Sequence, residues 1–275
     1  MEISPILTVA AKEFRDRIRN RWVLAVALVF TVFSLVIAYF GGAQQGAVGL
    51  RSIEFTIASL VSLVIYLIPL IALLLGFDAI VGERERGALD LLLSLPVTRL
   101  EVLLGKYLGL AAALTLSTVI GFGLTGAMLA SRLDMSGLFH YTGFVISSVL
   151  LGCAFLSLAV MLSTFASDRA RASGLAIGTW FFFVLVFDLL LLGALVASGG
   201  KLEYRWVGDW FPYALLFNPT DVFRILNIFS MEDVRTLYGL STVFPAQLAR
   251  PGVLGGVMLL WIVVPLMLAA LRFRR

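Results

Sequence analysis

The amino-acid sequence predicts an all-α integral membrane protein with six transmembrane helices. Its composition is 60% hydrophobic and 14% charged, and its mean hydropathy is +1.01. Soluble domains are typically about 45–50% apolar and about 25% charged. Several apolar runs are long enough to cross a bilayer as helices, which takes ~20 residues each. These runs do not alternate apolar and polar positions, as the strands of an outer-membrane barrel would.

The predicted spans are distributed along one transmembrane domain that covers residues 1–275. They run from Trp22 to Phe40, Ile57 to Phe77, Val102 to Ala130, Tyr141 to Phe165, Ala172 to Ala197 and Gly252 to Leu271. Three further parts are predicted outside the spans. They are an N-terminal interfacial helix at residues 1–21, a cytoplasmic connecting region with a short helix at 78–101, and a periplasmic helical loop at 198–251.

The N-terminal segment is charged and amphipathic. Apolar side chains recur at helical spacing, and cations occupy much of the remaining surface; the apolar positions are Ile6, Val9, Ala10, Phe14 and Ile18. A helix of this kind lies in the headgroup region with its cations toward anionic lipid. No apolar core is followed by a small-residue cleavage site, so we expect no removable signal peptide.

A charged stretch followed by leucines interrupts the apolar sequence between the second and third spans. Glu83 and Arg86 are spaced i,i+3, and Arg86 and Asp90 i,i+4, so these charges can share one helix face. Leucines at helical spacing follow, and Pro96 ends the run. We predict a short amphipathic helix that either lies flat on the membrane or docks a soluble partner. The candidate docking residues are Glu83, Arg84, Glu85, Arg86, Gly87, Leu89, Asp90 and Leu93.

The distribution of basic residues predicts the orientation of the chain. With the spans as assigned, 14 Lys and Arg residues lie on the side of the termini and the connecting region, and 7 lie on the opposite side. Positive charge in short loops marks the cytoplasmic side. Both termini and the connecting region are therefore predicted in the cytoplasm. The net charge of +4 reflects this orientation in the membrane and does not indicate nucleic-acid binding.

Asp188 is the acidic residue that lies deepest in a predicted span. It is ~14 Å from the outer end of its helix at 1.5 Å per residue, which is near the bilayer centre. A carboxylate is costly to leave facing lipid, so we expect Asp188 to face a helix interface or a water-filled cavity. It is either a packing residue that is protonated or hydrogen-bonded, or a group along a permeation path.

The outer loop contains a helix start with a recognisable cap. Asn218 can cap a helix, Pro219 suits its first turn, and Asp221 stands where an acidic residue favours the helix dipole. This helix either lies on or dips into the outer leaflet, or it forms an outer gate or a platform for a periplasmic partner. The candidate residues for that second role are Asn218, Pro219, Thr220, Asp221 and Arg224.

Motifs for catalysis, nucleotide binding and metal binding are absent from the sequence. There is no G-x-x-x-x-G-K-[ST] to hold ATP phosphates, no G-x-S-x-G and no H-E-x-x-H. One cysteine, Cys153, and one histidine, His140, cannot supply the ligand set of a zinc site. We therefore expect no cofactor, metal or catalytic site in this chain.

Two glycine pairs, Gly105 with Gly109 and Gly174 with Gly178, permit close helix approach.

Several segments resemble the permeases of type-2 ABC exporters. They are the N-terminal A-A-K-E-F-R-D-R-I-R-N-R-W and the stretch F-D-A-I-V-G-E-R-E-R-G-A-L-D-L-L-L-S-L-P-V-T-R, which is similar to the family's D-x-I-x-G-E-x-x-x-G-T/A-L pattern. In that family the second segment is the cytoplasmic coupling helix that docks on the ATPase. W-F-F-F-V-L-V-F-D-L and L-F-N-P-T-D-V-F-R-I-L-N resemble, more narrowly, the permeases of transporters that mature nitrous oxide reductase.

The resemblance implies a set of partners. Two copies of the chain would form the transmembrane core in the bacterial inner (plasma) membrane, and an ATP-binding subunit dimer of the NosF type would bind ATP and Mg²⁺ below it. A periplasmic protein of the NosD type would sit on the 198–251 loop, with a copper chaperone as a further candidate partner. The implied role is delivery of copper or sulfur to the copper–sulfur centre of the reductase. The alternatives are a type-2 exporter of a lipid, drug or other small molecule, and a stand-alone channel or scaffold.

Overall fold

The predicted fold class is confirmed. The computed structural model describes residues 3–40, 53–129, 135–197, 205–228, 248 and 250–273. Every regular element within these ranges is a helix. Six helices in the described part of the chain are long and apolar enough to cross a membrane.

The observed spans agree with the predicted ones to within a few residues at most ends. They are α2 (Trp22–Phe40), α3 (Ile53–Gly76), α6 (Arg99–Leu129), α7 (Met135–Phe165), a composite fifth span and α13 (Pro251–Phe273). The fifth span consists of α8 (Arg169–Phe181), the π-helix η3 (Phe182–Val186) and α9 (Phe187–Ala197). Helix α7 begins at Met135, before the predicted start at Tyr141.

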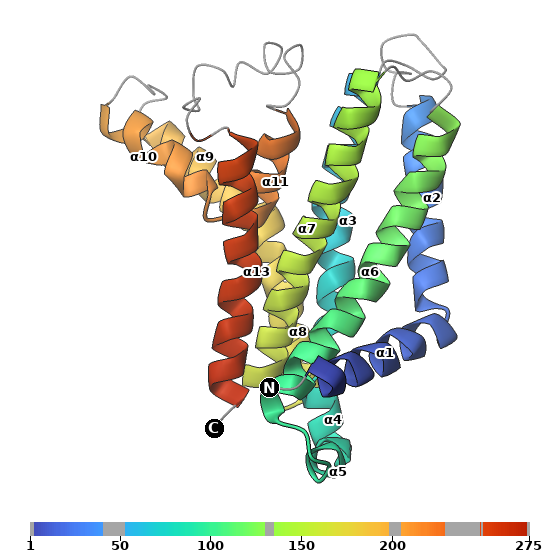
Figure 1. The fold of residues 1–275 in the computed structure, drawn as a ribbon. Coiled ribbons are helices and arrows are strands. Elements are labelled where there is room, and N and C mark those ends of the chain that lie inside the picture. The colour runs from blue at the N-terminus through green and yellow to red at the C-terminus, as the bar shows by residue number, and fades with distance from the viewer. Residues whose placement is uncertain are drawn as a thin grey trace.

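The helices outside the spans lie at the two ends of the bundle (Figure 1). At one end, α1 (Ile3–Arg19) crosses the base of the bundle, and α4 (Val81–Glu85) and α5 (Ala88–Leu93) protrude beyond it. Both ends of the chain lie there, and we call it the connector end. The opposite end, the loop end, carries α10 (Arg205–Leu215) and α11 (Pro219–Ile228).

A row of aromatic rings joins four helices in the core. Phe30 of α2 stacks on Phe122 of α6 at 5.1 Å between ring centroids, and Phe122 meets Phe144 of α7 edge-on at 5.2 Å. Phe144 contacts Phe223 of α11 at 6.3 Å. All four side chains are fully buried. Aromatic pairs of this kind add stabilisation beyond the apolar area that they bury, so α11 is part of the packed bundle.

Helix α1 packs closely against α6 because α6 presents glycine at the crossing. A Cβ atom on Gly105 would lie 2.7 Å from the Cβ of Val9, and one on Gly109 would lie 2.5 Å from the carbonyl oxygen of Ala10. The first predicted glycine pair therefore does permit a close approach. The second pair, Gly174 and Gly178, meets no atom within 4 Å in the described structure.

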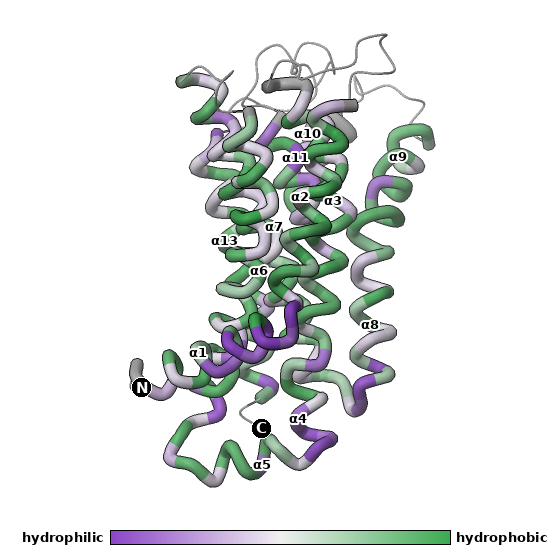
Figure 2. The backbone as a smooth tube through the Cα atoms, turned by 90° about the vertical axis from the view of Figure 1, so that its right-hand side faces the viewer, coloured by the Kyte–Doolittle hydropathy of each residue, from purple (hydrophilic) through white to green (hydrophobic). Residues whose placement is uncertain are grey.

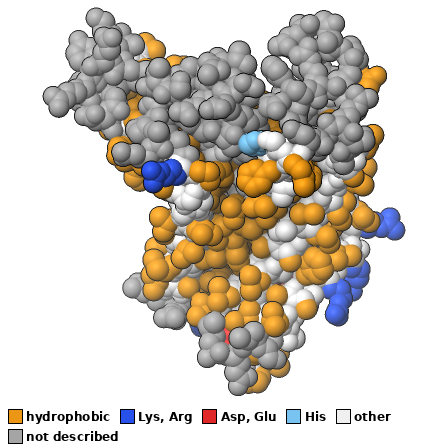
Figure 3. All heavy atoms as spheres, turned by 45° about the horizontal axis from the view of Figure 1, so that its top comes forward, with side chains coloured by type: hydrophobic (Ala, Val, Ile, Leu, Met, Phe, Trp, Pro, Cys, Tyr) orange, Lys and Arg blue, Asp and Glu red, His pale blue; other side chains and the backbone are white. Residues whose placement is uncertain are grey.

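The fifth span is the most exposed of the six. Only 6% of its most apolar window is buried, against 61% for the second and fourth spans. It stands at the side of the bundle in Figure 2, and its surface there is mostly apolar. Hydrophobic side chains also dominate the described part of the face shown in Figure 3, as expected for helices that contact lipid or another protein.

Candidate functional site

The connector, which we define as residues 78–101 between the second and third spans, contains two helices rather than one. The sequence analysis predicted a single amphipathic helix, and this was wrong, because Gly87 separates α4 from α5 with a φ of +68°. This left-handed conformation is accessible to glycine but cannot continue a right-handed helix. Glu83, Arg86 and Asp90 therefore do not share one helix face. The predicted apolar stripe is confirmed in part. Leu89 is buried, and Leu92 and Leu93 pack against the core, but Leu91 and Leu95, which were predicted to widen the stripe, are exposed.

The connector is held on one side by the junction between α7 and α8. Ser163 of α7 accepts hydrogen bonds from the backbone N–H groups of Ile80 and Val81 at 3.0 and 3.1 Å. Arg84 donates to the carbonyl oxygen of Ala166 at 3.2 Å. The two bonds to Ser163 satisfy backbone donors at the start of α4 that a helix cannot satisfy internally.

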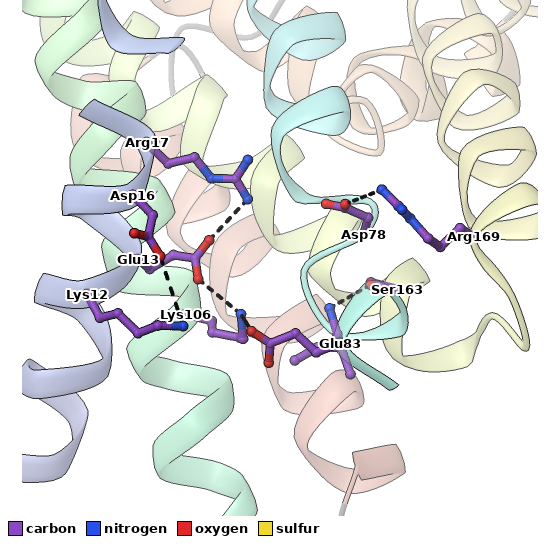
Figure 4. Close-up of polar contacts among 10 residues, drawn as sticks. Lys12, Glu13, Asp16, Arg17, Asp78, Glu83, Lys106, Ser163 and Arg169 are labelled. Atoms are coloured by element: carbon purple, nitrogen blue, oxygen red, sulfur yellow. Dashed lines mark hydrogen bonds and ion pairs between the residues drawn. The ribbon is translucent and has the colours of Figure 1, made fainter. Parts of the chain in front are cut away.

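Arg169, the first residue of α8, makes two further contacts to the connector. Its backbone N–H donates to the Glu85 carboxylate at 2.8 Å, and its guanidinium pairs with Asp78 at 2.8 Å (Figure 4). A carboxylate at a helix N-terminus is favoured by the helix dipole. The connector is thereby joined directly to the beginning of the fifth span.

On its other side, the connector is held by a buried group of charges, which we call the Lys106 cluster: Glu13, Arg17, Glu83 and Lys106. The Lys106 Nζ lies 2.7 Å from Glu83 Oε1 and 3.0 Å from Glu13 Oε2 (Figure 4). Arg17 pairs with Glu13 at 3.0 Å. Desolvation raises the pKa of Glu13, but Lys106 and Arg17 outweigh it, and the pKa is lowered overall.

The Lys106 cluster was not found by sequence reasoning. Glu13 lies on the same helix face as Ile6 and Ala10, at i+7 and i+3 from them, and Lys106 lies one turn inside the predicted third span. A charged residue at a core-facing position was the available signal, because such residues are rarely buried without a partner. Their partners come from distant parts of the sequence, and that pairing could not be read from spacing alone.

The structure divides the predicted docking residues into inward-facing and outward-facing groups. Glu83 and Leu89 are buried, so neither side chain lies on the outer surface of the connector. Leu93 is partly buried. Arg84 and Glu85 are exposed but engaged with α7 and α8. Of the predicted docking residues, Arg86, Gly87 and Asp90 are exposed and form no hydrogen bond or ion pair with α7 or α8 in the described structure. Leu91 and Leu95 beside them are also exposed.

Two concave surfaces flank the connector. A groove of about 750 Å³ lies between α1 and residues 92–101, with Val9, Leu92 and Pro96 among its lining residues. A second pocket of about 340 Å³ is lined in part by Arg84, Asp90, Arg99 and Arg272. A bound protein could therefore insert side chains on both sides of α5.

At the other end, η3 provides the contact between the fifth span and α11. The wider turns of a π-helix disturb the regular i→i−4 hydrogen-bond ladder, and here the carbonyl oxygen of Phe183 accepts hydrogen bonds from Asn218 at 2.9 Å and Thr220 at 3.3 Å. Asn218 also accepts from the backbone N–H of Thr220 at 3.0 Å. The predicted cap of α11 is thus confirmed, with Pro219 as its first residue.

Asp188 belongs to this same group. Arg224 of α11 pairs with Asp188 at 3.0 Å and with Asp221 at 2.6 Å, and Asn218 donates to Asp221 at 2.9 Å. The sequence analysis treated Asp188 and the Asn218–Arg224 segment separately, and the fold brings them together. The Asp221 side chain is 1% exposed, whereas Asp188 and Arg224 are 38% and 35% exposed. Asp188 is therefore paired but not enclosed within one chain.

Half of the predicted 198–251 partner surface lies outside the described residues, at 198–204, 229–247 and 249. The described residues contain no group of three or more His, Cys, Asp or Glu side chains arranged to hold a metal ion.

Comparison with known proteins identifies the family. The model of the ABC-2 family transporter proteins matches residues 7–275. The chain is 44% identical over 277 residues to a "Probable ABC transporter permease protein NosY" of Stutzerimonas stutzeri, covering 99% of both chains. It is 50% identical over 227 residues to a protein of the same description from Pseudomonas aeruginosa, covering 81% of both chains.

Proposed function

This chain belongs to the ABC-2 family of transporter proteins and is a permease, a transport subunit rather than a catalytic one, and from that premise we propose that a separate ATPase docks on its connector. The observation that carries this proposal is the connector itself. It protrudes from the bundle, presents Arg86, Asp90 and Leu91, and is flanked by two concave surfaces. The ATPase partner, of the NosF type, binds ATP and Mg²⁺.

We propose that the connector end faces the cytoplasm of a bacterium and that the six spans lie in its inner membrane. The 14 Lys and Arg residues assigned to that side, against 7 on the other, support this orientation. Both termini are then cytoplasmic, and α1 rests at the inner leaflet. A periplasmic partner of the NosD type would meet the loop end, where α10 and α11 lie.

The proposed mechanism is mechanical. ATP binding closes the ATPase dimer, which pushes on residues 83–96, tilts the second and third spans and rearranges the loop end. ATP can drive this change only if it favours one of two permease conformations over the other. The cargo that we propose is a copper or sulfur species for the copper–sulfur centre of nitrous oxide reductase, supported by the similarity to two proteins described as NosY.

Charge reversal at the two outward-facing connector residues tests docking. We expect Arg86→Glu together with Asp90→Lys to abolish co-purification of the ATPase, because both side chains are exposed and neither contributes an ion pair within the described residues. The matched control is Arg19→Glu on α1, whose side chain is 79% exposed. Unchanged ATPase recovery with the double variant would reject docking at the connector.

The same double variant tests the cargo. A strain that carries it should produce nitrous oxide reductase deficient in copper or acid-labile sulfide, measured by metal and sulfide analysis of the purified enzyme. A fully assembled reductase in a strain lacking this chain would instead favour export of a lipid, drug or other small molecule. Glu83 is unsuitable for this test because its side chain is buried against Lys106 and does not face a docked partner.

We further propose that two copies of the chain pair through the fifth span. Its exposed apolar surface, the open face at Gly174 and Gly178, and the incompletely enclosed Asp188–Arg224 pair all support a protein neighbour rather than lipid. A chain with one cysteine, Cys153, allows a direct test. In a Cys153→Ala background, Gly178→Cys should cross-link two copies and Leu260→Cys on α13 should not; the reverse pattern would exclude this interface.

A further inference from the structure

We propose that Lys106 is a positioning residue that transmits movement of the connector to α1 and α6. The inference rests on the proposed function in one respect, namely that an ATPase acts on the connector. Lys106 does not touch the proposed docking surface, because its side chain is 4% exposed. It acts through Glu83 of α4 and Glu13 of α1, which it holds together (Figure 4).

One ammonium group joins three separate elements at the connector end. Glu13 and Lys106 are 93 residues apart in sequence, and Glu83 comes from a third helix. With both carboxylates bonded to one Nζ at 3.0 and 2.7 Å, neither α1 nor α4 can move away from α6 without breaking a buried ion pair. Together with Arg17, the cluster contains two acidic and two basic side chains.

Stability alone does not account for a cluster of this kind. Replacing a buried ion pair by well-packed apolar residues is often neutral or stabilising, whereas removing one member is costly. Helix α1 is already fixed on α6 by the close contacts of Gly105 and Gly109. The charges therefore add a directional link between α4 and that helix pair, and apolar packing of similar volume would not supply it.

The two carboxylates that contact Lys106 differ in their number of cationic partners. Glu13 has two cationic partners, Lys106 and Arg17. Glu83 has Lys106 as its cationic partner in the described structure, and its second oxygen, Oε2, is buried with no hydrogen-bond partner there. Loss of Lys106 would leave Glu13 paired and Glu83 unpaired. The element released is then α4, which is the one that receives the force.

Helix α4 is held on its opposite side by α7 and α8, through Ser163, the Ala166 carbonyl and Arg169. It therefore connects one group of helices, α1 and α6, with another, α7 and α8. Beyond Gly87, the described side chains of α5 form no hydrogen bond or ion pair with another helix. A force applied at α5 can reach α6 directly through residues 94–98 and through the apolar packing of Leu89, Leu92 and Leu93. The polar route to both groups runs through α4, and the Lys106 cluster is the polar contact on one of its two sides.

The test uses the full permease–ATPase complex in lipid nanodiscs, with variants that separate positioning from folding. Lys106→Met removes the link, Lys106→Arg preserves the charge, and Glu83→Gln with Lys106→Met removes the link without leaving Glu83 as an unpaired charge. The matched control is Arg19→Met, which removes an exposed ion pair with Asp16 on α1. ATPase recovery and ATP turnover report docking.

Conformational coupling is read at the opposite end of the bundle. A cysteine placed at Met135, which is 85% exposed, is labelled in a Cys153→Ala background with and without ATP and Mg²⁺. We expect the ATP-dependent change in labelling rate to fall about tenfold in the Glu83→Gln/Lys106→Met variant, to be largely retained with Lys106→Arg, and to be unchanged with Arg19→Met. Docking and ATP turnover should persist in all variants.

The outcomes separate this inference from the proposed function. If the double variant docks the ATPase and retains the full ATP-dependent change, Lys106 has no positioning role, and docking at the connector stands. If Lys106→Arg fails as completely as Lys106→Met while both fold, the specific charge link is also rejected. If the unmodified chain recovers no ATPase, the proposed function itself fails.

Discussion

Replacement of Arg224 by methionine is expected to destabilise the protein by about 3 kcal/mol, the lower end of the range for breaking a buried ion pair by removing one partner. Arg224 is the cation that both Asp188 and Asp221 contact. Asp221 would keep its hydrogen bond from Asn218 but lose its charge partner while 1% exposed. We assign most of the cost to Asp221, since Asp188 is more than a third exposed.

Two variants establish whether unpaired charge is the cause. Arg224→Lys should have an intermediate effect, because a lysine can contact both carboxylates only as a point charge. Asp188→Asn and Asp221→Asn combined with Arg224→Met should recover much of the stability, because no charge then remains. Thermal unfolding in nanodiscs, followed by tryptophan fluorescence, measures all three. An unfolding midpoint of Arg224→Met equal to that of the unmodified chain would contradict the assigned pairing.

The second large effect is expected at the crossing of α1 and α6, where Gly109→Ala should destabilise the protein. The added Cβ would lie 2.5 Å from the carbonyl oxygen of Ala10 and 2.7 Å from the Cβ of Glu13. A backbone oxygen cannot rotate away as a side chain can, so α1 must shift. Overpacking of this kind typically costs about 1–3 kcal/mol, and the shift would also pull Glu13 from Lys106.

The control substitution, Gly123→Ala, is expected to change stability in the opposite direction. Gly123 lies in the same helix, α6, with no atom within 4 Å of an added Cβ. Alanine is favoured over glycine in a helix interior by about 1 kcal/mol, so Gly123→Ala should raise stability slightly while Gly109→Ala lowers it. Unfolding midpoints in nanodiscs decide between these outcomes. Equal stabilisation by both substitutions would show that α1 does not approach α6 as closely as described.

Features that depend on local sequence were predicted well. Apolar runs of sufficient length gave the spans, because lipid requires a continuous apolar helix whatever its neighbours. The cap of α11 at Asn218 and the buried stripe of Leu89, Leu92 and Leu93 were also correct. Each depends on residues within a few positions of one another, and the chemistry of caps and helical periodicity is local.

Features that depend on distant residues were not predicted. Glu83 was predicted as a docking residue, and its buried ion pair with Lys106 was not anticipated. Asp188 was expected to need a polar environment, but its partner Arg224 could not be identified. The π-helix at Phe182–Val186 left no distinctive pattern in an all-apolar sequence, although the polar contacts of α11 depend on it.

The sequence by itself determined that this chain is a six-span helical membrane protein of the ABC-2 family, with a charged connector between its second and third spans. The tertiary structure decided which of the charges face outward and which join helices. The reason is physical: hydrophobicity and helical periodicity act over one element at a time, whereas a buried charge is tolerated only where the fold brings a partner to it.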